Sequence, residues 1–185
     1  MTSYPFLIEF SMGGYQWYSP EDGPASPLEA EVALTDEEVR QLKDFVKQNG
    51  GERNASKLGL DKTLPDIFKK MNEATREVCD RVSYGNALIQ EFEQNEAWYD
   101  GDPHQMMARM ETDGLFEYDP ENSSVGEDDP DPKYSEYRIW FEEYFFSLPF
   151  DQMVAFIEKY YGYLAGRLTD EKMAYRYSVI ISAGA

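Results

Sequence analysis

The two ends of the chain carry strand-like patterns, whereas the long middle carries helical ones. Apolar and polar residues alternate with a period of two over residues 4–12, 29–34 and 174–182, which predicts three strands. A sheet that joins all three must bring together segments that lie far apart in the sequence. The regular strand–helix alternation of a parallel doubly wound sheet is absent. The sequence therefore predicts an α+β fold, with a small, mostly antiparallel sheet formed by the N- and C-terminal strands and packed by several helices.

Each predicted strand has one apolar face that is expected to be buried. These residues are Phe6, Ile8 and Phe10 in the first strand, Ala30, Val32 and Leu34 in the second, and Tyr175, Tyr177, Val179 and Ile181 in the last. Gly13-Gly14 ends the first strand. The stretch that follows has the composition of a loop and allows a short strand over residues 15–18.

A helix start follows the second strand immediately. Thr35 is a favourable N-cap residue, and Glu38 three residues later completes a capping box. Asp36 and Glu37 add negative charge at the positive end of the helix dipole. The helix is predicted to end at Asn49-Gly50. Its apolar stripe consists of Val39, Leu42, Phe45 and Val46.

Three further helices are predicted from their start signals and their 3.6-residue periodicity. They run from Pro65 towards Val82, from Asp102-Pro103 to Gly114, and from Pro149 to Gly162. The apolar stripe of the first can be continued through Phe92, unless Gly85-Asn86 breaks the helix.

The remaining part of the middle is predicted to be extended or irregular. Residues 115–118 favour a short strand. Residues 119–135 contain three prolines and no periodicity, which predicts an acidic, Pro-rich loop within a single domain of residues 1–185. Over residues 137–146 bulky groups alternate on both sides, which favours a two-sided strand, with a helix as the alternative.

The negative charge of the chain is concentrated in one segment. The formal net charge is −19, and the 41 residues from Glu96 to Glu136 hold 13 acidic side chains against two basic ones, Arg109 and Lys133. More than half of the net charge therefore lies in under a quarter of the chain. One interpretation is a solvated loop that serves solubility, because like charges repel and keep a loop open.

Composition excludes several classes of protein. The 14 Tyr, 11 Phe and 3 Trp are too many for a chain that is disordered throughout. The acidic balance argues against direct nucleic-acid binding, which needs clustered Lys and Arg. Cys79 is the only cysteine, so neither an intramolecular disulfide nor a Cys-ligated zinc site can form. We expect no cofactor and no metal.

The N-terminal residues lack the basic region, the apolar stretch and the cleavage site of a signal peptide. No apolar run approaches the roughly 18 residues that span a bilayer. These observations favour a cytoplasmic protein without a membrane partner, and charge repulsion favours a monomer or a weak dimer.

Aromatic residues lie inside and beside the acidic segment, and this combination favours protein binding. Carboxylates steer a basic partner to a surface, and Tyr and Trp supply anchoring area. We therefore predict an acidic binding or inhibitor protein that engages a basic protein partner without catalysis. The candidate partner-binding residues are Trp98, Asp100, Asp102, Glu127, Asp128, Asp129, Asp131, Tyr134 and Tyr137. In size and charge the chain is similar to small cytoplasmic immunity proteins and inhibitors, which often block a cationic toxin or nuclease.

Two alternatives remain open. One is a nucleic-acid mimic whose carboxylates imitate a phosphate array, which requires rigidly spaced acids. The other is a hydrolase or metal-dependent enzyme that uses His104, the only histidine, with nearby carboxylates. The carboxylates closest to it in sequence are Asp100, Asp102 and Glu111. Cys79 lies on an apolar stripe, which favours an inert buried thiol, and no phosphate-binding or hydrolase motif is present.

Overall fold

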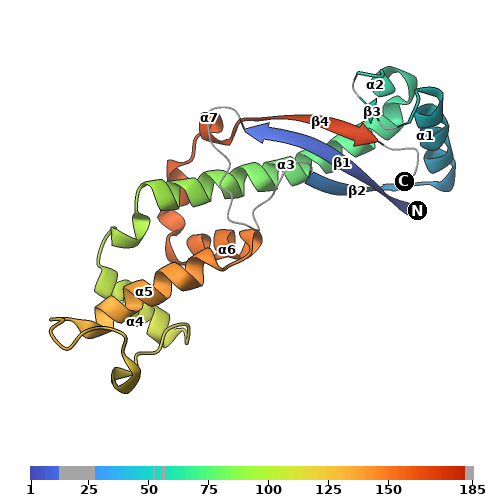
Figure 1. Cartoon of the computed structure of the whole chain (residues 1–185). Coiled ribbons are helices and arrows are strands. Elements are labelled where there is room, and N and C mark those ends of the chain that lie inside the picture. Colours follow the sequence, from blue (N-terminus) through green and yellow to red (C-terminus); the bar gives the residue numbers. More distant parts are fainter. Residues whose placement is uncertain (13–27, 52, 56, 182–185) are drawn as a thin grey trace. The chain divides into compact units, whose positions relative to one another are not determined.

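The structure is a computed structural model that describes residues 1–12, 28–51, 53–55 and 57–181 (Figure 1). These residues form two compact units. The sheet unit comprises the described residues up to Ala87 and those from Thr169 onwards, and the helical unit comprises Leu88–Leu168. Helix α3 (Pro65–Gln94) contributes to both. The expectation of a single domain over residues 1–185 stays a prediction.

The fold is α+β, as the sequence predicts, with an antiparallel sheet built from both ends of the chain. The strand order is β2-β1-β4-β3. The strands are β1 (Thr2–Met12), β2 (Leu28–Leu34), β3 (Arg53–Asn54) and β4 (Tyr175–Ile181). Strand β1 lies between β2 and β4, and the register runs from Thr2 opposite Leu34 to Met12 opposite Tyr175. The two-residue strand β3 extends the sheet beyond β4. The strand allowed over residues 15–18 lies outside the described residues.

The alternation in β1 and β2 predicts correctly which side chains are buried. The buried residues are Tyr4, Phe6, Ile8, Phe10 and Met12 in β1, and Leu28, Ala30, Val32 and Leu34 in β2. In β4, Val179 and Ile181 are buried, whereas Tyr175 and Tyr177 are half-buried. The hydroxyl of Tyr175 donates to Asp80 of α3. Full burial of one large apolar side chain contributes about 1.5–3 kcal/mol, so this apolar face stabilises the sheet unit.

Helix α1 (Asp36–Gln48) begins and ends where the sequence predicts. Thr35 Oγ1 accepts from the Glu38 N–H at 3.1 Å, and Glu38 Oε2 accepts from the Thr35 N–H at 2.9 Å, so the capping box is complete. Glu38 also pairs with Lys70 of α3 at 2.8 Å. The buried stripe consists of Leu42, Phe45 and Val46, with Val39 half-buried.

Helix α3 continues through Gly85-Asn86 to Gln94 without a break. Glycine in a helix costs about 1 kcal/mol relative to alanine. That cost is small beside the burial of the surrounding residues, which are all below a tenth exposed from Val82 to Phe92 apart from the half-buried Tyr84. A short helix, α2 (Leu60–Thr63), precedes α3, and α7 (Asp170–Met173) precedes β4.

The helical unit consists of short helices around an aromatic core. Its remaining elements are η1 (Ala97–Tyr99), α4 (Pro103–Thr112), η2 (Pro120–Asn122), α5 (Pro132–Phe146), α6 (Phe150–Tyr160) and η3 (Gly162–Arg167). Phe92 of α3 contributes to the core, with its ring centroid 4.5 Å from that of Phe145 and 5.0 Å from that of Tyr161. No helix in the described ranges is both long and apolar enough to cross a membrane.

The predicted strand over residues 137–146 is wrong, and the alternative, a helix, is correct. Tyr137, Phe141 and Phe145 are buried at four-residue spacing on one face of α5. Trp140 and Tyr144 are half-buried and Phe146 is exposed, so aromatic residues surround the helix. In the sequence, aromatic residues on every side of a helix give the same pattern as a strand with two apolar faces.

The structure also corrects the expectations for residues 115–118 and 119–135. The predicted strand over residues 115–118 is wrong, because these residues belong to no helix or strand. Within the predicted loop of residues 119–135, residues 120–122 form η2, and α5 already begins at Pro132.

Candidate functional site

Three aspartates of the helical unit cap helices with their side chains. Asp102, Asp119 and Asp131 each stand directly before a proline, and they cap α4, η2 and α5 respectively. Their carboxylates accept from the N–H groups of His104 at 3.0 Å, Glu121 at 3.0 Å and Tyr134 at 3.3 Å. Proline is favourable at the first helical position because that N–H has no partner within a helix. Two candidate binding residues, Asp102 and Asp131, therefore have a structural role.

Asp129 also stabilises the start of α5. One of its carboxylate oxygens accepts from the Asp131 N–H at 2.8 Å, and the other accepts from the Ser135 hydroxyl at 2.7 Å. This candidate binding residue therefore orders the chain that leads into the helix.

Glu136 attaches the acidic loop to α5. One carboxylate oxygen accepts from the hydroxyls of Ser123 and Ser124, at 2.8 and 2.9 Å, and from the Val125 N–H at 3.1 Å. These hydrogen bonds, that from Ser123 foremost, lower the pKa of Glu136. The loop is therefore held against the helix, in contrast to the open loop of the solubility interpretation.

Glu127 and Asp128 differ from these acids. Both side chains are exposed. Neither makes a hydrogen bond or an ion pair with any residue that the structure describes. Of the four loop acids among the candidates, these two have carboxylates that are free to contact a partner.

The three aromatic candidates differ in exposure. Tyr137 is 5% exposed, and burial raises its pKa to about 12, which favours a core role for it. Trp98 and Tyr134 are half-buried. Each of these two is therefore partly exposed to solvent.

His104 joins α4 to α5. Its ring stacks on Tyr134, with 4.5 Å between the centroids, and its Nε2 lies 2.8 Å from Asp131 Oδ2. This hydrogen bond, followed by that from the Tyr134 N–H, lowers the pKa of Asp131. The only histidine thus contacts the N-cap of the next helix.

The carboxylates closest to His104 in sequence interact with other groups. Asp100 accepts from the Tyr163 hydroxyl at 2.9 Å, Asp102 caps α4, and Glu111 pairs with Lys133 at 2.8 Å. Among the described residues, no three His, Cys, Asp or Glu side chains come together as a group that could hold a metal ion. The structure therefore does not assemble the ligand set suggested by their closeness in sequence.

Both basic residues of the acidic segment have partners inside the helical unit. Arg109 donates to the Lys159 carbonyl oxygen at 3.2 Å and lies over the Tyr160 ring, 4.7 Å from its centroid. Lys133 is the partner of Glu111. Neither base is positioned to neutralise Glu127 or Asp128 directly.

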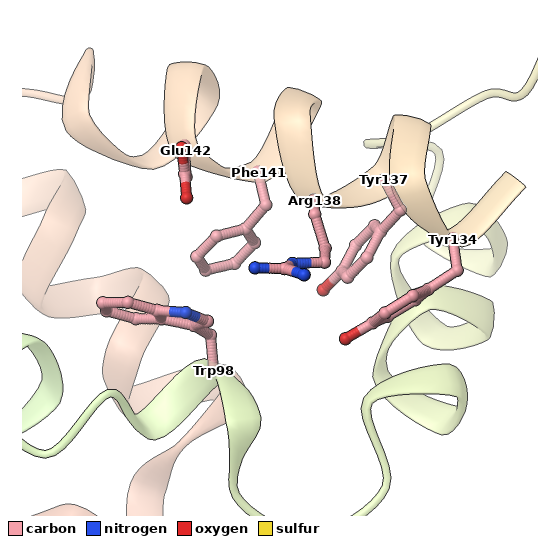
Figure 2. A pocket seen from close by; sticks show the side chains of 6 residues that line it. All are labelled: Trp98, Tyr134, Tyr137, Arg138, Phe141 and Glu142. Carbon is pink, nitrogen blue, oxygen red and sulfur yellow. The ribbon is translucent and has the colours of Figure 1, made fainter. Parts of the chain in front are cut away.

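A small hollow lies between η1 and α5 (Figure 2). We call it the aromatic hollow, and it is lined by Trp98, Tyr134, Tyr137, Arg138, Phe141 and Glu142. Its volume is about 10 Å³, the lower limit for holding one water. The structure thus brings together three predicted binding residues and adds three that the sequence interpretation missed. Helical spacing was the missing signal, because residues 134, 137, 138, 141 and 142 share one face of a helix.

Arg138 and Glu142 give the aromatic hollow one side chain of each charge. Arg138 Nη2 donates to the Tyr99 hydroxyl, and the guanidinium carbon lies 4.9 Å from the centroid of the Tyr99 ring. In Figure 2 the guanidinium projects into the space among the lining rings. Glu142 stands one helical turn later, is exposed, and has no ion-pair partner among the described residues.

Cys79 is fully buried on α3 in the sheet unit. Burial raises the pKa of its thiol to about 11, so the thiol is protonated at neutral pH. The structure therefore favours the inert thiol that the sequence predicts.

Comparisons with known proteins give no relative from which a role could be transferred. The chain matches no protein-family model, and no curated protein or solved structure is significantly similar to it.

Proposed function

We propose that this protein is an acidic binding or inhibitor protein whose helical unit engages a basic protein partner. The observation that carries the proposal is the excess negative charge of residues 96–136, a formal net −11, of which bases outside the segment pair with only Asp100 and Asp113 among the described residues. Asp131 and Glu136 have lowered pKa values, so they stay ionised at neutral pH although they are hydrogen-bonded. Glu127 and Asp128 add exposed carboxylates that have no partner within the described part of the chain.

The two kinds of acid support binding in different ways. The capping carboxylates are fixed in place and contribute a steady negative potential that attracts a basic surface over about 10 Å at 0.1 M salt. Glu127 and Asp128 can form direct ion pairs with that surface. Trp98 and Tyr134 supply the adjoining aromatic area that commonly anchors an interface.

The partner is a basic protein, as in the immunity proteins and inhibitors of similar size and charge. A monomer or weak dimer in the cytoplasm, without direct nucleic-acid binding, belongs to the same proposal. The single, buried Cys79 is compatible with a reducing compartment.

The test is the association kinetics of a captured basic partner. Changing Glu127→Gln together with Asp128→Asn should lower the association rate about two- to tenfold at low salt and flatten its salt dependence. The matched control is Glu9→Gln with Glu29→Gln, which removes two exposed charges from the sheet unit. An unchanged rate and salt slope for the Glu127/Asp128 variant would leave the loop with a role in solubility alone.

A nucleic-acid mimic is the second candidate, and one observation favours it. Such a mimic needs rigidly placed carboxylates, and Asp102, Asp119, Asp129 and Glu136 are each held by hydrogen bonds. If the captured partner binds DNA, the mimic predicts strict competition between this protein and DNA. Simultaneous binding of both would exclude it. An enzyme that uses His104 stays a third hypothesis, and its test is hydrolase activity that is lost in His104→Ala.

A further inference from the structure

The aromatic hollow has the chemistry of a cation site. The faces of aromatic rings carry partial negative charge and attract ammonium and guanidinium groups. Trp98, Tyr134, Tyr137 and Phe141 surround the hollow, and Glu142 contributes a carboxylate. All of these residues belong to the helical unit, which also holds the acidic segment.

The protein's own Arg138 lines this site, and its cation–π contact is with Tyr99, which does not line the hollow. Its guanidinium projects among the rings in Figure 2 and is held by the ring and hydroxyl of Tyr99. Arg138 makes no ion pair with any described carboxylate, although Glu142 is on the next turn of α5. Since an exposed cation–π contact is worth little and Arg138 is exposed, it can leave the hollow at small cost.

We propose that the aromatic hollow recognises an arginine side chain of the basic partner, and that Arg138, one of its lining residues, restricts the hollow to about 10 Å³ in the free protein. This inference rests on the proposed function for the source of the arginine. A guanidinium that enters from outside along a different path can contact the rings and also pair with Glu142. It thereby gains an ion pair that Arg138 lacks, which is the reason for the exchange.

The decisive experiment removes the internal cation and supplies an external one. Arg138→Gln frees the space that the guanidinium fills. Nα-acetylarginine amide is then titrated into the wild-type protein and the variant, and binding is followed through the indole N–H resonance of Trp98, assigned with Trp98→Phe. We expect the dissociation constant of the variant to be about tenfold lower than that of the wild-type protein. Equal dissociation constants, or no binding to the variant, would overturn the proposal.

Control ligands identify the group that is recognised. Nα-acetylcitrulline amide has nearly the shape of the arginine ligand without its charge, and it should not bind. Nα-acetyllysine amide and tetramethylammonium should bind more weakly than the arginine ligand, because the hollow already accommodates a planar guanidinium. Binding of the citrulline ligand, or tighter binding of either ammonium ligand, would refute recognition of arginine.

Control variants identify the site. Arg167 lies over the Tyr163 ring at 5.1 Å, outside the hollow, so Arg167→Gln should keep the wild-type affinity. Adding Glu142→Gln to Arg138→Gln should weaken binding several-fold. Tyr99→Phe keeps Arg138 but removes its hydroxyl acceptor, so it should give an intermediate gain and serves as a second route if Arg138→Gln folds poorly. A gain in Arg167→Gln equal to that in Arg138→Gln would place the effect outside the hollow.

The outcomes separate this inference from the proposed function. If the Glu127/Asp128 variant slows partner association but Arg138→Gln gains no affinity for the arginine ligand, the proposed function stands and this inference fails. If Arg138→Gln binds the arginine ligand more tightly but the Glu127/Asp128 variant associates with a basic partner at the wild-type rate, the hollow is confirmed as an arginine site. The proposed role of the acidic loop then fails.

Discussion

The sheet unit and the helical unit use their acidic residues differently. On α1, Glu37, Glu38 and Asp44 form ion pairs with Arg40 or Lys70, so cations stand beside these carboxylates. The helical unit also has ion pairs, such as that between Glu111 and Lys133. Several of its carboxylates, however, accept from two or more neutral groups within the described chain, a backbone N–H among them, whereas Glu31 and Asp36 of the sheet unit each accept from one hydroxyl. These carboxylates of the helical unit are Asp102, Asp119, Asp129 and Glu136.

This difference separates two properties that are easily confused. A hydrogen bond from a neutral donor satisfies a carboxylate and fixes its position, but it leaves the negative charge in place. An ion pair satisfies the carboxylate and also cancels most of its field. The acidic segment is therefore well ordered internally and strongly charged externally, which is the combination that our proposed function requires.

The largest expected effect concerns whether the two units unfold together. Phe92→Ala removes a fully buried ring from the helical unit and should cost about 3–5 kcal/mol, and Ile8→Ala in β1 should cost about 2–5 kcal/mol. Because α3 contributes to both units, each variant should shift one common unfolding transition in calorimetry. Two separate transitions, with only one displaced by each substitution, would instead show two independent domains.

The next effect compares a helix cap in each unit. Thr35→Ala removes the capping box of α1, and Asp102→Ala removes the cap of α4. Each should lower the free energy of unfolding by about 0.5–2 kcal/mol, as measured by urea denaturation. Thr35→Ser and Asp102→Asn keep a cap and should stay near the wild-type value. If either Ala variant is as stable as the wild-type protein, the corresponding hydrogen bond does not stabilise its helix.

Lowering the pH should reduce the stability of the fold by protonating Asp131 and Glu136. The pKa values of Asp131 and Glu136 are lower in the folded chain than the unfolded values of about 3.9 and 4.3. Their stabilisation is therefore fully present above those unfolded values and is lost as the pH falls through the lower folded ones. The urea midpoint measured from pH 6 to 2.5 should fall less steeply in Glu136→Gln than in the wild-type protein. Parallel curves for the Glu136→Gln variant and the wild-type protein would contradict this account.

The smallest expected effect is the change in the free energy of unfolding of the Glu127→Gln, Asp128→Asn double variant. This variant should unfold within about 0.5 kcal/mol of the wild-type protein, because neither side chain has a partner within the described chain. Adding Asp129→Ala and Asp131→Ala, which remove the acceptors of the Asp131 and Tyr134 N–H groups, should lower the stability further. The sequence alone predicts little change for all four substitutions, and the caps of α5 are the reason to revise that expectation. A quadruple variant as stable as the double variant would show that these caps contribute nothing.

Much of the sheet unit could be predicted from the sequence because its signals are local. Alternation in β1 and β2 and the pair Thr35 and Glu38 each determine structure within a few residues. The helical unit was harder because α5 has aromatic residues on every side, so neither a period of two nor one of 3.6 stands out. Its start at Asp131-Pro132 is the clearest local signal, and it resembles the Asp102-Pro103 start that was predicted.

Because α5 is predicted as a strand, three of the six residues that line the aromatic hollow are not predicted from the sequence. In a strand, Tyr137 and Phe141 would point to one face, and Arg138 and Glu142 to the opposite one. In a helix these four residues share a face, and the aromatic hollow follows. Trp98 and Tyr134 were found from composition alone, because aromatic residues next to acidic ones suggest a binding surface. Their partners depended on the conformation of α5, which the local sequence did not determine.

The strand order has a consequence for how the chain is completed during synthesis. Strand β4 occupies the place between β1 and β3, yet it follows β2 by about 140 residues. At typical ribosomal rates it emerges on the order of 10 s after the β1–β2 pair. The helical unit, Leu88–Leu168, emerges in between. A nascent chain therefore carries its charged, helical part before β1 can pair along Leu7–Met12, and that edge of β1 stays open to wrong pairing until β4 arrives.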